Sequence, residues 1–442
     1  MNHSRRPLQP ERPGLVAWAL WVYAVIAIGR LGELIPGIAA LPLAKLAIGV
    51  ALAGALVTKG WAAHGPMLQS PLVRTAAWLL LLVFLSVPLS IWRSSSLSFI
   101  LEVVTVLAVG FVFVFKVGRN WRVVRGTLVA VTAAGAVLAL AALTTYESGR
   151  IAVGTSYDTN DLAYVLVTVL PLGIAFAMHR HGVKRVAWIG TVAVLLVTAL
   201  LTQSRGGLLG LLAVALLLVM VPLTPPRAGA QVSKKARWAR RALIAGLIGA
   251  IVWVQLPDEA RLRFATMFNL SADYNMDESN ETGRMDIWKR NLAATLSRPV
   301  GFGINTFGSV DYMTGGKDKA AHNSLVQIAV ELGFLGAWLF LRLYWLAWKR
   351  LGTIAAHARE RPDMAEPESV AEFRSIAVAL RIALVGNFVC GFFLSQAYSN
   401  LVWILFAAIA AMIALPQGMA CMEQVPARIG KRVARLRRSP AG

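Results

Sequence analysis

The chain has 442 residues, of which 57% are hydrophobic and 15% charged, whereas a soluble domain carries about a quarter charged residues. Together with a mean hydropathy of +0.62, this composition excludes a soluble enzyme and predicts an all-α polytopic membrane protein. The formal net charge of +22 would favour a nucleic-acid partner in a soluble chain. Here, however, the basic residues stand in short blocks between apolar runs, as topology signals do, so we expect contact with membrane lipid and no nucleic acid.

About twelve apolar runs approach the roughly 20 helical residues that a bilayer core of about 30 Å requires. The predicted transmembrane helices cover residues 14–29, 37–57, 75–92, 97–117, 127–145, 162–179, 186–202, 207–224, 242–256, 324–347, 376–394 and 400–416. The first run resembles a secretory signal, but it lacks a convincing small-residue cleavage site and many further runs follow. We therefore expect it to be retained as the first helix.

One long polar segment interrupts these runs. It divides the chain into transmembrane helices one to nine (1–256), a loop domain (257–323), transmembrane helices ten to twelve (324–416) and a basic tail (417–442). Alternate loops differ in their basic content, because one set and the tail carry clusters of lysine and arginine while the other set carries single arginines. Positively charged loops stay in the cytoplasm, so both termini are predicted to be cytoplasmic and the loop domain to face the other side. ATP is absent there, so any reaction must draw its energy from an activated substrate.

The loop domain is predicted to contain amphipathic helices. Met285, Trp288, Leu292 and Leu296 recur at helical spacing and form one apolar stripe, which predicts a helix lying on the membrane surface. Residues 259–270 are predicted to form another. A turn-rich return with several glycines then leads to a histidine, directly before the tenth span.

The predicted outer face presents few polar side chains. They are Arg150, Asp158, Asn160 and Asp161 before the sixth span, Gln203, Ser204 and Arg205 between the seventh and eighth, Arg284 in the loop domain, and His322 with Asn323 at its end. Arginines beside one histidine, without clustered carboxylates, indicate anion recognition and proton transfer, because the guanidinium fork matches phosphate oxygens. The two cysteines, Cys390 and Cys421, have no metal-ligand spacing. We therefore expect no metal and no other cofactor.

Arg205 has two interpretations. It stands in a short turn and could simply extend its charged group to the membrane interface at a helix end. Alternatively, the following Gly206 and Gly207 would let an anionic ligand approach the backbone N–H groups at the start of the eighth helix. The acidic and amide side chains at Asp158, Asn160 and Asp161 are equally open to capping the sixth helix and to contacting substrate.

His322 could pack or cap at the interface, or it could act as a base. Asn323 or Ser324 can cap the tenth helix, which places the imidazole near the positive end of the helix dipole. This position and neighbouring arginines disfavour the imidazolium, which leaves a neutral base at pH 7 that can remove a proton from a sugar hydroxyl. Glu331, nine residues on, faces the opposite side of the helix and is not expected to orient His322.

The chain resembles the O-antigen ligase and polymerase superfamily of bacterial envelope glycosyltransferases. The layout of about twelve spans with a long external loop after the ninth also matches, so the resemblance covers most of the chain. The matching pieces are Gly154 and Thr155 with Asn160, Leu162 and Ala163; Ser204, Arg205 and Gly206; Gly283 and Arg284 with Trp288, Pro299, Gly301 and Gly303; and His322 and Asn323 followed by Glu331, Gly333 and Gly336.

The resemblance implies a GT-C-like enzyme of the bacterial inner membrane that works on the periplasmic face in lipopolysaccharide biosynthesis. It implies metal-independent, inverting transfer of a glycan from undecaprenyl diphosphate to a sugar of lipid A-core. By position, His322 would be the catalytic base and Arg205 and Arg284 would hold the diphosphate, with Asn323, Asn160, Gln203, Arg150 and Asp158 as further substrate-binding candidates. We expect the protein to act as a monomer.

Three alternatives stay open at this point. An O-antigen polymerase or a protein O-oligosaccharyltransferase would use the same donor with another acceptor, and Arg290 with Gly301 has the spacing of a polymerase loop motif. A transporter of lipid-linked sugars would use Arg205 and Arg284 as substrate contacts. The absence of a convincing hydropathy repeat between the two halves counts modestly against a transporter.

Overall fold

The computed structural model describes residues 14–35, 37, 41–58, 65–118, 120–154, 157–223, 258–265, 283–358 and 367–422, with isolated positions between 238 and 249. These residues form helices and connections, and the described part contains no β-strand, only an isolated bridge between Val153 and Tyr157. The predicted all-α class is confirmed.

Each predicted span coincides with a helix except the ninth, 242–256, of which at most isolated positions are described. The helices of spans one to eight and of span ten are α1 (Leu15–Gly29), α3 (Leu43–Val57), α5 (Pro71–Ser86), α6 (Arg93–Val112), α7 (Trp121–Thr144), α8 (Thr159–Met178), α9 (Gly182–Leu201), α10 (Arg205–Met220) and α15 (Ser324–His357). The last two are α16 (Pro367–Gly391) and α17 (Asn400–Ala414). Short helices α2 (Leu31–Leu34) and α4 (Gly65–Leu68) lie in connections.

The apolar helices differ in length. Six described helices are long and apolar enough to cross a bilayer, namely α7, α8, α9, α15, the segment Val370–Gly391 of α16, and α6 with its π-helical extension to Val117. A seventh span is possible if α17 is joined to the following helical segment Pro416–Met422, from which it is bent by 73°. Helices α1, α3, α5 and α10 are shorter. The chain is thus a multi-pass helical membrane protein, and the number of twelve crossings stays a prediction.

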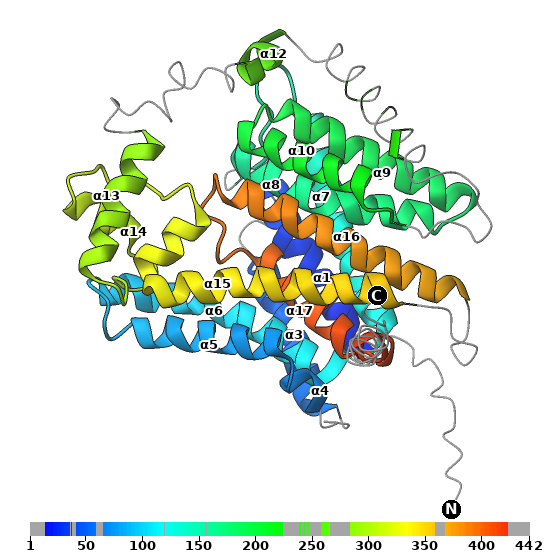
Figure 1. The fold of residues 1–442 in the computed structure, drawn as a ribbon, viewed down its shortest axis with the longest axis horizontal. Coiled ribbons are helices and arrows are strands. Elements are labelled where there is room, and N and C mark those ends of the chain that lie inside the picture. The colour runs from blue at the N-terminus through cyan, green and yellow to red at the C-terminus, as the bar shows by residue number, and fades with distance from the viewer. Residues whose placement is uncertain are drawn as a thin grey trace, which may run out of the picture.

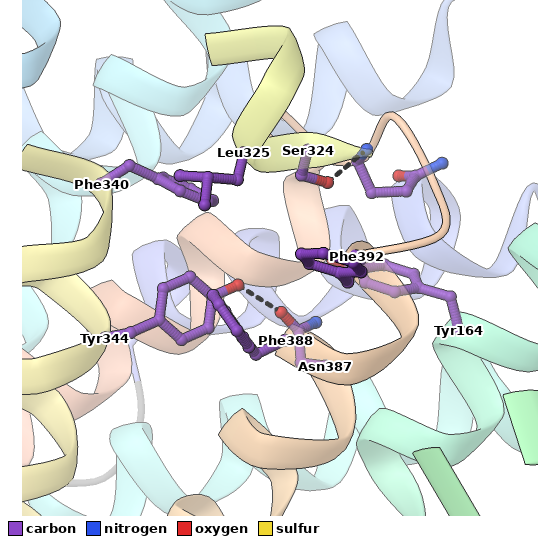
Figure 2. A pocket seen from close by; sticks show the side chains of 10 residues that line it. Tyr164, Ser324, Leu325, Phe340, Tyr344, Asn387, Phe388 and Phe392 are labelled. Atoms are coloured by element: carbon purple, nitrogen blue, oxygen red, sulfur yellow. Dashed lines mark hydrogen bonds between the residues drawn. The ribbon is translucent and has the colours of Figure 1, made fainter. Parts of the chain in front are cut away.

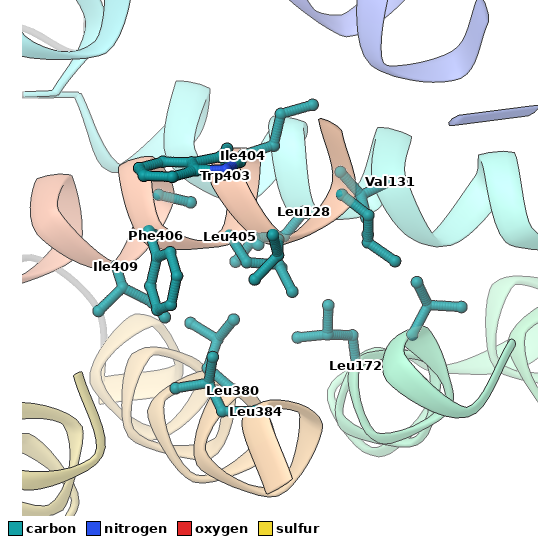
Figure 3. Close-up of a cluster of buried hydrophobic side chains, with 14 of the residues drawn as sticks. Leu128, Val131, Leu172, Leu380, Leu384, Trp403, Ile404, Leu405, Phe406 and Ile409 are labelled. Carbon is teal, nitrogen blue, oxygen red and sulfur yellow. The ribbon is translucent and has the colours of Figure 1, made fainter. Parts of the chain in front are cut away.

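Helix α17 lies at the centre of the bundle. Nearly all its side chains from Leu401 to Ile413 are buried, as expected for a helix that is apolar on every face. Figure 3 shows Trp403, Leu405 and Phe406 packed among leucines of α7, α8 and α16. Around this centre, α16 packs on α8, α10 and α15, while α15 also packs on α5 (Figure 1).

The loop domain contributes α12 (Asp258–Ala265), α13 (Arg284–Ser297) and α14 (Phe307–Met313), and α13 and α14 lie together at one end of the molecule (Figure 1). The predicted apolar stripe is only partly right. Trp288 is buried, but Leu292 and Leu296 are 38% and 70% exposed. The buried face instead carries Ile287, Trp288, Asn291 and Thr295, because α13 packs against α15 and α14. Residues 266–282 lie outside the described ranges.

Helix α15 is broken at Gly333, whose φ of 72° and ψ of −174° are non-helical. The glycine-rich return fills the break. The N–H groups of Phe302 and Gly303 donate to the carbonyls of Val330 and Glu331, both at 2.9 Å, and the Phe334 N–H donates to the Pro299 carbonyl at 3.1 Å. These bonds satisfy backbone groups that a break in a membrane helix would leave without partners.

The other side of the return is held by the connection between α5 and α6. The Ile91 N–H donates to the Phe302 carbonyl at 3.0 Å, and the Ser96 hydroxyl donates to the Ile304 carbonyl at 2.6 Å. A Cβ atom on Gly303 would lie 2.4 Å from the Ser90 side chain, so only glycine fits there. The return is therefore clamped between the start of α6 and the break in α15.

We predict that Gly333→Ala will destabilise the protein by about 2 kcal/mol or more, because its dihedral angles belong to a region that is essentially restricted to glycine. The added Cβ would also lie 2.1 Å from the Pro299 carbonyl oxygen. The melting temperature of purified protein in detergent measures this effect. Gly110→Ala is the matched control, because this helical glycine has no atom within 4 Å of the added Cβ. Equal melting temperatures for the two variants would contradict the clamp.

Candidate functional site

His322 occupies a fixed bend between the loop domain and α15. Its φ of 45° is left-handed, and its backbone N–H donates to the Ser395 hydroxyl at 2.9 Å. The preceding carbonyl, of Ala321, accepts a hydrogen bond from the Trp288 indole at 2.7 Å. The bend is thus held from one side by α13 and from the other by the connection between α16 and α17.

Asn323 caps α15, as the sequence suggested for this position. Its side-chain oxygen accepts from the N–H groups of Leu325 at 2.9 Å and Val326 at 3.1 Å. Its amide nitrogen is buried and makes no hydrogen bond with any residue that the structure describes. A hydrogen-bond donor is thereby available beside His322.

The connection between α16 and α17, residues 392–399, joins the two halves of the site, a role that no sequence pattern predicted. The Ser324 hydroxyl donates to the Leu394 carbonyl at 2.7 Å and accepts from the Gln396 N–H at 2.9 Å. The Gln396 side chain donates to the Asp161 carboxylate of α8 at 2.7 Å. Through this segment, His322 and the start of α8 hold fixed positions relative to each other.

Asp158 and Asn160 are held by hydrogen bonds at the start of α8. The Asp158 carboxylate accepts from the N–H groups of Asn160 at 2.7 Å and Asp161 at 2.8 Å, which confirms that it caps the helix. The Asn160 side-chain oxygen accepts from the Ser204 hydroxyl at 2.8 Å and from Arg150 at 3.5 Å. These bonds attach α8 to the start of α10.

Arg150 and Gln203 connect the turn before α8 to the turn between α9 and α10. The Arg150 guanidinium donates to the Thr202 carbonyl at 3.2 Å. The Gln203 side chain donates to the Gly149 carbonyl at 2.9 Å, and Gln203 itself has a left-handed φ of 51°. Both side chains therefore hold the turn that precedes Arg205.

Arg205 is the first residue of α10, and the access to a backbone N–H expected at Gly207 is wrong. The Gly207 N–H is not open to a ligand, because it donates to the Ser204 hydroxyl at 3.1 Å. A Cβ atom on Gly207 would lie 2.6 Å from the Ala163 side chain, and one on Gly206 would lie 3.0 Å from the Phe393 side chain. The glycines allow α10 to approach α8 and the α16–α17 connection closely.

The two sides of the site meet at this connection. Phe393, which contacts Gly206, lies two residues from Ser395, which holds His322. The neighbouring Phe392 packs edge-on against Trp288 of α13 with ring centroids 5.6 Å apart. Arg205 and His322, far apart in sequence, thus adjoin the same short segment.

The electrostatic surroundings keep His322 neutral. Burial lowers its pKa below the ordinary value of 6.5, and the positive charge of Arg284 lowers it further. The Asp158 carboxylate opposes this shift, while Lys319 adds to it. The charges of Arg284 and Asp158 therefore both act on His322, as expected of residues near one site.

Arg290, the residue of the polymerase-like spacing, is held within the loop domain. It pairs with Asp286 and, at 2.7 Å, with the buried Asp311 of α14. Burial would raise the pKa of Asp311, but hydrogen bonds from Arg290, the Lys319 N–H and Asn291 outweigh it and hold the pKa below its ordinary value. This cluster joins α13 to α14 and to the segment before His322. The structure therefore gives Arg290 a role in holding the loop domain together.

A small cavity lies beneath the start of α15 (Figure 2). The Tyr344 hydroxyl donates to the Asn387 side-chain oxygen at 2.6 Å, as the dashed line in Figure 2 shows. The Asn387 amide in turn donates to the Thr168 hydroxyl of α8 at 3.2 Å. This polar network links α15, α16 and α8 beneath the site by hydrogen bonds between helices.

Part of the chain is similar to a known protein family. No curated protein matches the chain, but residues 190–341 match the model of the O-antigen ligase family. The matched segment includes Arg205, Arg284 and His322, and it ends within α15. The start of α8 and the α16–α17 connection lie outside it. The match agrees with the resemblance found in the sequence, and it shows that residues 190–341 of this multi-pass helical protein are similar to the O-antigen ligase family.

Proposed function

We propose that this protein is an O-antigen ligase. It transfers a glycan from undecaprenyl diphosphate to a sugar hydroxyl of lipid A-core, at the periplasmic face of the bacterial inner membrane. The observation that carries the proposal is His322 in a fixed bend, where burial and the charge of Arg284 lower its pKa, with Arg205 on the helix that contacts the same connection. The similarity of residues 190–341 to the O-antigen ligase family supports transfer of the O-antigen ligase or polymerase type.

His322 acts as the general base in the proposed reaction. It accepts the proton of the acceptor hydroxyl while that oxygen attacks the anomeric carbon of the donor. The bond between the anomeric carbon and the diphosphate oxygen breaks from the opposite face, so the configuration inverts. The left-handed bend and the hydrogen bond to Ser395 fix the backbone of His322, from which the imidazole extends. A fixed backbone lowers the entropic cost of aligning the base with the acceptor hydroxyl.

Arg205 and Arg284 hold the diphosphate. Negative charge grows on this leaving group in the transition state, and preorganised guanidinium groups stabilise it without ATP or metal. Arg284 then has two effects, because it also lowers the pKa of His322. One cation thus keeps the base neutral and neutralises the leaving group.

The remaining candidates act at the edge of this site. Asn323 offers its buried amide to a substrate oxygen. Asn160, Asp158, Gln203 and Arg150 border the substrate and at the same time hold the starts of α8 and α10 in place through their hydrogen bonds. Substitution of these four is therefore expected to disturb both donor binding and local structure.

The acceptor distinguishes ligase from polymerase and transporter. We predict that the purified protein, given lipid-linked glycan donor and lipid A-core together with EDTA, will form glycosylated lipid A-core. Strict dependence on added metal would contradict the mechanism. Extension of a lipid-linked acceptor without transfer to lipid A-core would identify a polymerase. Translocation of the lipid-linked sugar in vesicles without a new glycosidic bond would identify a transporter.

The pH dependence of transfer tests the assigned charges. The base must be neutral, so the rate should fall as pH drops through the lowered pKa of His322, below pH 6.5. Arg284→Gln removes a cation that lowers this pKa, so the acidic limb should move to higher pH. Asp158→Asn, which can still cap the helix, removes an anion and should move the limb to lower pH.

Lys289→Gln is the matched control, because Lys289 is an exposed cation of the same helix as Arg284 and is not among the charges that act on His322. Its acidic limb should coincide with that of the unaltered protein. The midpoint of the limb is independent of how much the plateau rate falls. Unchanged midpoints in both Arg284→Gln and Asp158→Asn would contradict the role of His322.

A further inference from the structure

A groove of about 500 Å³ lies between α5 and α15, apart from the residues assigned to transfer. Its walls are apolar along most of their length, and their side chains face outward. Trp78 and Trp338 are 62% and 53% exposed, and Leu85 and Leu335 are 53% and 55% exposed. On the outer surface of a membrane protein, such side chains face lipid chains rather than water.

One end of the groove is positively charged. Arg74 of α5 and Arg342 of α15 both line it. The Arg342 guanidinium donates to the Thr75 hydroxyl at 3.1 Å and lies over the Trp338 ring, 5.2 Å from its centroid. None of the carboxylates that the structure describes forms a salt bridge with either arginine.

An arginine within a membrane helix is costly unless an opposite charge or a polar environment compensates it. A hydroxyl and an aromatic ring orient Arg342 but leave its charge in place. Arg74 lines the same groove and adds like charge, which an anion would offset. The groove therefore combines two cations at one end with an apolar channel leading away from them.

We propose that this groove binds one anionic phospholipid, with its phosphate between Arg74 and Arg342 and an acyl chain along Leu85 and Leu335. Charge complementarity selects an anionic headgroup, because a zwitterionic one brings its own ammonium group towards the two arginines. The apolar walls match an acyl chain. The site is separate from glycan transfer.

The position of the groove separates this lipid from the donor. Its charged end lies at the start of α5, whereas the end of α5 leads to the turn that binds the return before His322. The phosphate site and His322 are therefore at opposite ends of α5. Arg74 belongs to the loops that the distribution of basic residues assigns to the cytoplasm, which places the phospholipid in the cytoplasmic leaflet.

Native mass spectrometry of the full chain in detergent tests the proposal with phosphatidylglycerol as probe and phosphatidylcholine as reference. The unaltered protein should retain one phosphatidylglycerol in preference to phosphatidylcholine. Arg74→Gln should weaken retention about fivefold, and the double variant Arg74→Gln with Arg342→Gln roughly 25-fold, given the usual contribution of one basic residue at a lipid surface. Arg74 is exposed, so its single variant is expected to fold even if the double variant does not.

Arg122→Gln is the matched control, since Arg122 is an exposed arginine on the same predicted side and does not line the groove. It should retain phosphatidylglycerol like the unaltered protein. Equal retention by Arg74→Gln and Arg122→Gln would overturn the site. Equal retention of the two phospholipids would also overturn it, as would displacement of phosphatidylglycerol by undecaprenyl phosphate, which would make the groove a polyprenyl site.

Discussion

The structure depends on how backbone groups are satisfied where α15 is broken. A helix that stops inside a membrane leaves N–H and C=O groups without partners, and in lipid this is costly. The return at Pro299–Gly303 supplies the partners, and Gly301 and Gly333 allow the two backbones to approach. The buried Glu331 adds a further connection, because its carboxylate accepts from the Tyr398 hydroxyl at 2.9 Å. The loop domain is therefore attached at membrane depth, and the direction of His322 follows from that attachment.

The proposed site is assembled from three distant parts of the chain. Helix α13 carries Arg284, the start of α10 carries Arg205, and the segment before α15 carries His322. The α16–α17 connection contacts all three parts through Phe392, Phe393 and Ser395. The loop domain alone would not hold the diphosphate in the proposed mechanism, because Arg205 lies outside it on α10. The first turns of α8 and α10 must therefore keep fixed positions relative to the loop domain.

The sequence predicted much of the fold because apolar runs mark helices whatever their surroundings. It also narrowed the cap of α15 to Asn323 or Ser324, since capping is a local interaction, and the structure has it at Asn323. It placed the apolar face of α13 wrongly, because Leu292 and Leu296 suggested contact with membrane while Asn291 and Thr295 are buried against protein. It missed Ser395 and Gln396, which are ordinary polar residues between two apolar runs. Their importance arises only from tertiary contacts that a single sequence does not reveal.

The proposed mechanism requires His322 to remove the acceptor proton. The most direct test measures donor binding and single-turnover transfer for His322→Ala, with His357→Ala as control at the far end of α15. We predict that His322→Ala binds donor normally and transfers about 100-fold to 10,000-fold more slowly, while His357→Ala keeps the normal rate. Transfer by His322→Ala at a rate near that of the unaltered protein would contradict the role of His322 as base.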